Sequence, residues 1–228
     1  MKQIIAALLL AGIVLSLVSC MNRDKNSTTS SSSQESTNSG NISPGAVTTT
    51  AEGVLEHLYG TFLNNVLPAF GVNSVEEVKT YFVGTEMEVV TETDEDTGEE
   101  FSYEKPKNEP GEISLDDAEG LQTQTLFPAN AVDKIQNAAM FYNMMNMNNG
   151  TFSAFKFKNE SDMQNVADQI QHNIKNNQWI CGVPEYYVIM RTDDVLLCAF
   201  GLENSLRAWQ SAVSSTYVNA ETLYEDAI

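Results

Sequence analysis

The chain has 228 residues, 31 acidic side chains against 12 basic ones, and a formal net charge of −19 at pH 7. Nucleic-acid binding requires basic patches that neutralise phosphates, so this composition excludes a nucleic-acid partner. The two histidines, His57 and His172, do not form the i, i+4 pair of a metalloprotease helix, and no other catalytic or metal-binding motif is present.

The first twenty residues have the pattern of an export signal. Lys2 precedes an uncharged, mostly apolar run from Ile4 to Val18, which is shorter than the roughly 20 residues that span a bilayer. The segment Leu17-Val18-Ser19-Cys20 resembles the lipobox of bacterial lipoproteins, in which the cysteine receives a diacylglycerol before cleavage. This resemblance implies removal of residues 1–19 and acyl chains on Cys20 as the only attached group. The alternative is an ordinary signal peptide with an incidental cysteine.

Residues 20–50 contain too few apolar side chains to form a core. Between Asn26 and Thr50, 14 of 25 residues are serine or threonine. We therefore expect a flexible tether that begins at the lipidated Cys20. The remaining residues, 51–228, are of the usual size for a single globular domain.

Two amphipathic helices are predicted at the start of this domain. The first follows the capping-box spacing Thr49-x-x-Glu52 and carries apolar residues at helical intervals from Val54 to Leu67. The second follows Ser74 and stops near Gly84.

Residues 86–117 form an acidic insertion with 13 carboxylates and only two lysines. The β-forming runs 88–92 and 100–103 flank a turn at 94–98, which predicts a protruding hairpin followed by an irregular return. We expect the insertion to be mobile because it has few large apolar residues.

The turn of this hairpin resembles a calcium loop only in part. Asp94-x-Asp96-x-Gly98 has its glycine at the fifth position rather than the sixth, and Lys105 stands where an EF-hand has glutamate. An EF-hand is therefore excluded. A weak cation site among Glu92, Asp94, Asp96 and Glu99 remains as an alternative to a solvated acidic turn.

A helix is predicted from Pro128 to Met147. One stripe of this helix, Val132, Ile135, Ala139 and Tyr142, is expected to face the core. A second stripe on the opposite side contains Met140, Phe141, Met144 and Met147. This second stripe is either buried between layers or an exposed surface that contacts a protein partner, since methionines adapt well to partners.

The rest of the chain alternates strands and helices. Residues 152–158 predict a half-exposed strand, Asn159 caps a helix that ends before Trp179, and 186–190 with 195–200 predict a hairpin that is apolar on both faces. With a Thr192-Asp193 loop, Cys198 pairs with Tyr187, and Cys181 lies too far away for a disulfide. A last helix is expected near 205–218.

This order of elements predicts an α+β fold, a small, largely antiparallel sheet packed with helices. Together with the lipobox and the tether, the order and pattern of residues 126–201 resemble a family of uncharacterised Gram-positive surface lipoproteins, a domain of unknown function. The resemblance implies a location at the cell surface and supplies no mechanism.

These observations favour a non-enzymatic lipoprotein on the outer face of the cytoplasmic membrane that binds another envelope protein. The membrane is then a partner through the lipid alone. One alternative is an envelope hydrolase whose active site is dispersed along the chain, with His57 or His172 beside a carboxylate and a hydroxyl. The other is a small-ligand receptor for a transporter, which would require a cleft between two lobes.

Overall fold

The computed structural model describes residues 50–228, which lie within one compact unit. The signal segment, Cys20 and nearly all of the tether lie outside the described residues. The described helices are α1 (Ala51–Phe70), α2 (Val75–Lys79), α3 (Ala118–Thr125), α4 (Met163–Asn176) and α5 (Glu203–Thr216), with short 3-10 helices at Ala129–Lys134, Met147–Asn149 and Glu160–Asp162.

A seven-stranded antiparallel sheet forms the centre of this region. Its strand order is β1-β5-β6-β8-β7-β9, and β4 also pairs with β5. The strands are β1 (Phe82–Val83), β4 (Gly111–Ile113), β5 (Ile135–Asn143), β6 (Gly150–Phe157), β7 (Tyr186–Thr192), β8 (Val195–Gly201) and β9 (Glu221–Ala227). The predicted α+β class, with a largely antiparallel sheet, is confirmed.

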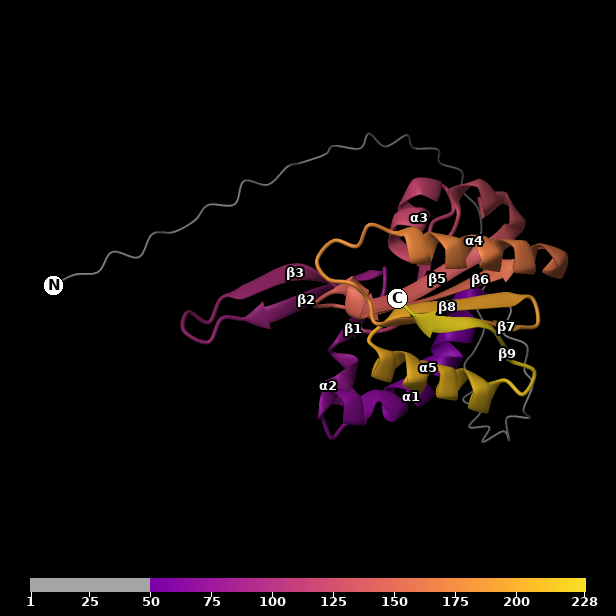
Figure 1. Cartoon of the computed structure of the whole chain (residues 1–228). Helices are drawn as coiled ribbons and strands as arrows, with labels where there is room; N and C mark the ends of the chain where they lie inside the picture. The colour runs from indigo at the N-terminus through magenta and orange to yellow at the C-terminus, as the bar shows by residue number, and fades with distance from the viewer. Residues whose placement is uncertain (1–49) are drawn as a thin grey trace, which may run out of the picture. The chain divides into compact units, whose positions relative to one another are not determined.

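Helices cover both faces of the sheet (Figure 1). One face packs against α1, α2 and α5, and the other packs against α3 and α4. The β7–β8 hairpin lies between these layers, with Tyr186 and Val188 in the first core and Tyr187 and Ile189 in the second. The prediction that both faces of this hairpin are covered is therefore confirmed.

The predicted helices α1, α4 and α5 are present, and each buries one apolar stripe against the sheet. The side chain of Thr50 accepts a hydrogen bond from the amide of Gly53, so the N-cap of α1 is one residue later than predicted. Helix α1 continues past Pro68 to Phe70 and is capped by Gly71, whose φ is 66°.

The helix predicted at 128–147 is wrong. The 3-10 helix Ala129–Lys134 begins this segment, β5 follows from Ile135 to Asn143, and only Met147 at its end is again in a 3-10 helix. Strand β5 has helices on both sides, so apolar residues occupy both of its faces and remove the alternation that marks a half-exposed strand. The expected core stripe is not formed, because Ile135 and Ala139 lie in different cores.

Strand β6 is buried on both faces rather than half exposed. All eight of its residues are buried, because β5 and β8 flank it and helices cover both sides. Phe155 and Phe157 share one core as predicted. Lys156 is only 9% exposed, and its ammonium is 2.7 Å from a carboxylate oxygen of Asp194.

The loop of the β7–β8 hairpin is Asp193-Asp194, so the predicted register is wrong by two residues. Cys198 pairs with Ile189 instead of Tyr187. A shift of two residues leaves every side chain on its predicted face, because the period of a strand is two. Cys181 is exposed and Cys198 is buried, and both are free thiols, as predicted.

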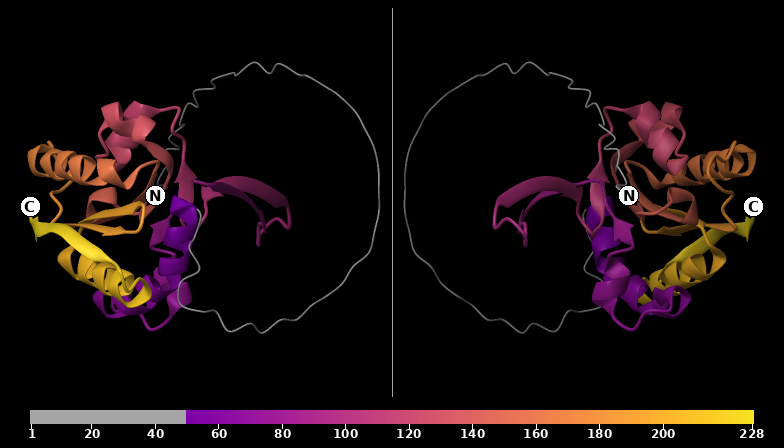
Figure 2. Two further views of the ribbon diagram at one scale, coloured as in Figure 1. Left: turned by 90° about the vertical axis from the view of Figure 1, so that its right-hand side faces the viewer. Right: turned by 90° about the vertical axis from the view of Figure 1, so that its left-hand side faces the viewer.

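Strands β2 (Met87–Thr93) and β3 (Glu100–Pro106) form a separate two-stranded sheet. This hairpin projects well away from the main sheet, as Figures 1 and 2 show, so the predicted protrusion is confirmed. The predicted irregular return is wrong at residues 111–113, because β4 pairs with β5 in the main sheet. None of the helices in residues 50–228 is both long and apolar enough to cross a bilayer.

Candidate interaction surface at the hairpin end of the sheet

The large apolar side chains that stay exposed gather at one end of the sheet. Among residues 50–228 there are ten such side chains, and Val218 is the only one that lies on neither the β2–β3 hairpin nor the neighbouring loops. The other nine are Met87, Val89, Phe101, Tyr103, Met144, Met145, Ile180, Val183 and Leu202. Exposed apolar patches are common at interaction surfaces, so this end of the sheet is the candidate surface on the described part of the chain.

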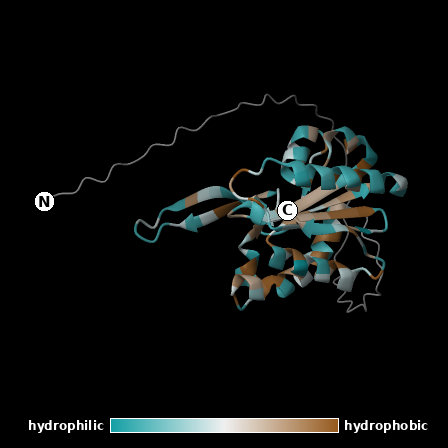
Figure 3. Cartoon of the chain, viewed as in Figure 1, coloured by the Kyte–Doolittle hydropathy of each residue, from teal (hydrophilic) through white to brown (hydrophobic). Residues whose placement is uncertain are grey.

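Sheet topology brings these distant segments together. Strand β1 leads into the hairpin and pairs with the last residues of β5, while Gly150 and Tyr186 both pair with Gly201. The loops 144–149 and 177–185 therefore leave the sheet at the same end as the hairpin. We call this surface, the hairpin with residues 144–149, 177–185 and 202, the hairpin end. Figure 3 shows the apolar colour in the loop that joins α4 to β7.

The two loops of the hairpin end are fixed to each other by side-chain amides. Asn146 Nδ2 donates to the carbonyl of Cys181 at 2.8 Å, and Asn148 Nδ2 donates to the carbonyls of Ile180 and Gly182 at 2.6 and 2.8 Å. These bonds hold Ile180, which is 79% exposed, in a defined position at the surface. These two loops are thus held in one arrangement relative to each other, and preorganisation of this kind lowers the entropic cost of binding.

The base of the hairpin is tied to the body of the domain. Gly84 N donates to Lys107 O at 2.9 Å, Lys107 N donates to Glu86 O at 2.8 Å, and Thr85 Oγ1 donates to Glu112 O at 2.6 Å. At Gly84 the two chain segments approach so closely that an added Cβ would overlap the carbonyl oxygen of Glu109 and stand 2.9 Å from Gly111 N.

Gly84→Ala should therefore lower the free energy of unfolding by about 1–3 kcal/mol, because backbone atoms must move apart. Gly60→Ala is the matched control, since Gly60 is exposed in α1 and an added Cβ there meets nothing within 4 Å. Its expected effect is a stabilisation of up to about 1 kcal/mol, from helix propensity. Urea unfolding of both variants measures the difference, and equal stabilities would contradict the close approach at Gly84.

The hairpin has two chemically different faces. Cross-strand pairing places Met87, Val89, Glu104 and Glu100 on one face, which we call the groove face. The opposite face carries Val90, Phe101 and Tyr103 together with Glu88, Glu92 and Lys105. The rings of Phe101 and Tyr103 stack with their centroids 6.1 Å apart.

The groove face leads into an apolar groove at the base of the hairpin. This groove has a volume of about 400 Å³ and is lined by Gly84, Thr85, Met87, Pro106, Gln124, Tyr142 and Met147. Met87 belongs to both the groove and the groove face, so the apolar surface continues from the hairpin onto the loop 144–149.

The hairpin is also strongly acidic. Residues 87–106 contain eight carboxylates and one lysine. Lys105 pairs with Glu88 at 3.3 Å, and Tyr103 donates its hydroxyl proton to Glu92 at 2.7 Å. Within residues 50–228, no lysine or arginine pairs with the exposed Glu100 and Glu104. The groove face therefore presents uncompensated negative charge.

The weak cation site considered from the sequence is not assembled. Within residues 50–228 no three histidine, cysteine or acidic side chains gather as metal ligands. Asp94 instead accepts backbone hydrogen bonds from Thr97 and Asp96 at 2.8 and 2.9 Å, and those bonds hold the pKa of its carboxyl below the ordinary value. Glu92 accepts a hydrogen bond from the hydroxyl of Tyr103, and this bond raises the pKa of Tyr103. Asp96 and Glu99 complete the turn.

The four residues of the predicted second stripe do not form a stripe. Met140 and Phe141 are fully buried on opposite faces of β5. Met144 is 54% exposed and Met147 lines the groove, so only these two belong to the hairpin end. The sequence carried a usable signal for the rest, because Met145, Ile180 and Val183 are large apolar residues within turn segments rich in asparagine and glycine.

The two histidines named in the hydrolase alternative lie far apart in the fold. His57 lies on α1 and His172 on α4, and these helices cover opposite faces of the sheet. His57 makes an edge contact with the ring of Tyr217 at 6.0 Å, and His172 contacts Asn176. The fold therefore does not bring the two histidines together.

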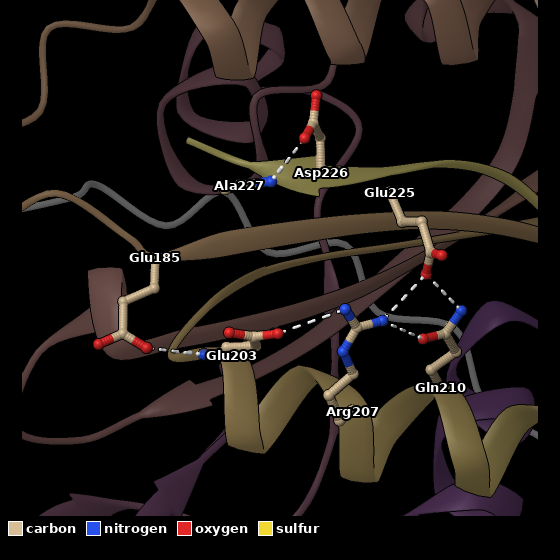
Figure 4. Close-up of polar contacts among 7 residues, drawn as sticks. All are labelled: Glu185, Glu203, Arg207, Gln210, Glu225, Asp226 and Ala227. Atoms are coloured by element: carbon tan, nitrogen blue, oxygen red, sulfur yellow. Dashed lines mark hydrogen bonds and ion pairs between the residues drawn. The ribbon is translucent and has the colours of Figure 1, made fainter.

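A polar cluster around Arg207 fixes the C-terminal strand (Figure 4). Arg207 Nη1 and Nη2 lie 3.3 Å from Glu225 and Glu203, and the guanidinium lies 4.3 Å from the centre of the Tyr186 ring. Gln210 also donates to Glu225 at 2.7 Å. The cluster links α5 to β7 and β9, and the exposure of its ion pairs limits each to about 1 kcal/mol or less. We assign it a structural role.

Comparison with known proteins gives no match for this chain: no family model, no curated protein and no solved structure resembles it significantly.

Proposed function

We propose that this chain is a lipoprotein, anchored through Cys20 to the outer face of the cytoplasmic membrane, whose domain is a non-enzymatic module that binds another envelope protein through the hairpin end. The observation that carries the binding role is the gathering of nine exposed apolar side chains at one end of the sheet. A soluble surface without a partner rarely concentrates apolar side chains in this way.

The anchor and the surface fit together physically. A diacylglycerol with a further acyl chain holds a protein stably at a membrane, whereas a single chain binds weakly. The composition of residues 20–50 is that of a flexible tether, for which a root-mean-square reach of about 30 Å is expected, enough for the domain to meet a neighbouring envelope protein. The acidic domain would be repelled by anionic lipid, so the lipid on Cys20 must supply the attachment.

Labelling with radioactive palmitate tests the anchor. Cys20→Ala should abolish the label and move the protein out of the membrane fraction, because the acylated thiol is lost. Cys181→Ala is the control, since Cys181 is an exposed free thiol of the domain and its loss should leave the label unchanged. Undiminished label in Cys20→Ala would contradict the proposed anchor.

Photo-crosslinking in intact cells tests the binding role. A photoreactive amino acid at Met145 or at Val89, which lies on the groove face, places the probe in the hairpin end, and the same probe at Val218, which is 96% exposed, reports chance encounters elsewhere on the domain. We expect one discrete cross-linked protein from the two hairpin-end positions and none from the control. Equal patterns at all three positions would refute the hairpin end as a binding surface.

A further inference from the structure

We infer that the partner segment bound at the hairpin end is cationic, with an apolar anchor residue that fills the groove at the hairpin base and with lysine or arginine side chains that follow the groove face toward the hairpin tip. This inference rests on the proposed binding role of the hairpin end. It specifies the chemistry of the partner and the direction in which the partner lies.

The groove supplies the place for the anchor. Its lining combines Met87, Pro106, Tyr142 and Met147, and its volume of about 400 Å³ has room for a leucine or aromatic side chain. Met147 belongs to the turn that the asparagine hydrogen bonds attach to the loop 177–185. The part of the groove wall that Met147 forms is therefore held in place before binding.

The charges that would attract the basic residues lie on the same face. Glu104 pairs across the hairpin with Val89, and Glu100 pairs with Thr93, so both carboxylates project from the groove face beyond Met87. At about 3.3 Å per residue, Glu104 stands roughly 7 Å and Glu100 roughly 20 Å from Pro106 at the groove. An extended segment with basic residues about two and six positions after its anchor would meet both.

Charge decides between the candidate occupants. A second copy of the chain would bring another net charge of −19 to the contact, and an anionic membrane surface would also be repelled. The opposite face is a poorer candidate for cationic recognition, because Lys105 already pairs with Glu88 and Tyr103 already binds Glu92.

A peptide series tests the inference on the full-length chain in detergent micelles. The probe is a fluorescent extended peptide with one leucine and lysines two and six positions further along, made in both chain directions. Control peptides replace the lysines by glutamate, or the leucine by serine. Fluorescence anisotropy should show binding of the lysine-leucine peptide in one direction, weakening as ionic strength rises, and much weaker binding of both controls.

Two double variants with the same change in net charge locate the site. The double variant Glu100→Gln/Glu104→Gln should lower the affinity for the lysine-leucine peptide by about fivefold, as expected for the loss of two exposed ion pairs. The double variant Glu88→Gln/Glu92→Gln, on the opposite face, should lower this affinity by less than about twofold. All four positions lie at the surface of the hairpin, and matching thermal midpoints confirm that the variants remain folded.

Equal losses in the two double variants, or equal binding of the lysine and glutamate peptides, would overturn the inference. That failure differs from failure of the proposed function, which the cross-linking pattern decides. A partner cross-linked specifically at the hairpin end through an acidic or neutral segment would leave the binding role in place and refute the cationic partner.

Discussion

Met140→Lys is expected to lower the free energy of unfolding by several kcal/mol, whereas Met144→Lys should change it by less than about 0.5 kcal/mol. Met140 is fully buried in β5, opposite Ser153 of β6 on one side and Gly111 of β4 on the other. A lysine there would carry its ammonium into an apolar core without a partner. Met144, four residues later in the chain, is 54% exposed and beyond the end of the strand.

The two variants add the same charge, so their difference isolates burial from net charge. Urea unfolding followed by circular dichroism gives both free energies, and peptide binding at the hairpin end gives a second readout for Met144→Lys. A Met140→Lys chain as stable as its parent would contradict the placement of Met140 in the sheet.

The elements that were predictable from sequence have local signals. Helix α1 begins after a capping residue and has apolar residues at helical spacing, and α4 shows one clean stripe from Met163 to Ile174. The β7–β8 hairpin combines two β-forming runs with a short polar turn. In each case the spacing of apolar residues is enough to predict the element. Each helix buries a single face, and the β7–β8 hairpin buries both of its faces.

The elements that were missed depend on tertiary context. Strand β5 is covered on both faces, so its sequence does not alternate and resembles a buried helix. Strand β9 is a mostly exposed edge strand with acidic residues at both ends, and it is held by partners such as Arg207 and Lys175 that no local pattern reveals. Charged residues on an edge strand also disguise its strand character.

The hairpin end could be predicted only in part. The acidic hairpin is evident from its composition and its turn. The contribution of residues 144–149 and 177–185 is not, because sheet pairing brings them to the hairpin from more than 35 residues away in the chain. Exposure also depends on the fold, and for that reason Met140 and Met144 seemed equivalent in sequence although only Met144 is at the surface.

Trp209→Ala should lower the free energy of unfolding by about 3–5 kcal/mol. Trp209 is fully buried on α5 and lies within a cluster of aromatic rings, with centroids 5.9 Å from Phe62, 5.9 Å from Phe141 and 5.4 Å from Phe152. These rings join α1, α5, β5 and β6. Removal of the indole therefore leaves a cavity at the point where two helices meet the sheet, and dense packing prevents the neighbours from filling it.

Trp209→Phe separates the contribution of ring packing to stability from the contribution of the indole N–H. The indole nitrogen Nε1 is buried and has no hydrogen-bond partner within residues 50–228, a condition that costs about 1–3 kcal/mol in a protein interior. Phenylalanine removes this N–H and keeps one ring in the cluster, so relief of the unsatisfied group offsets the smaller ring. We expect the free energy of unfolding of Trp209→Phe to stay within about 1 kcal/mol of the parent value, while Trp209→Ala loses about 3–5 kcal/mol. Denaturant unfolding measured by circular dichroism compares the three chains, and a Trp209→Phe variant as unstable as Trp209→Ala would show that the indole nitrogen has a stabilising partner.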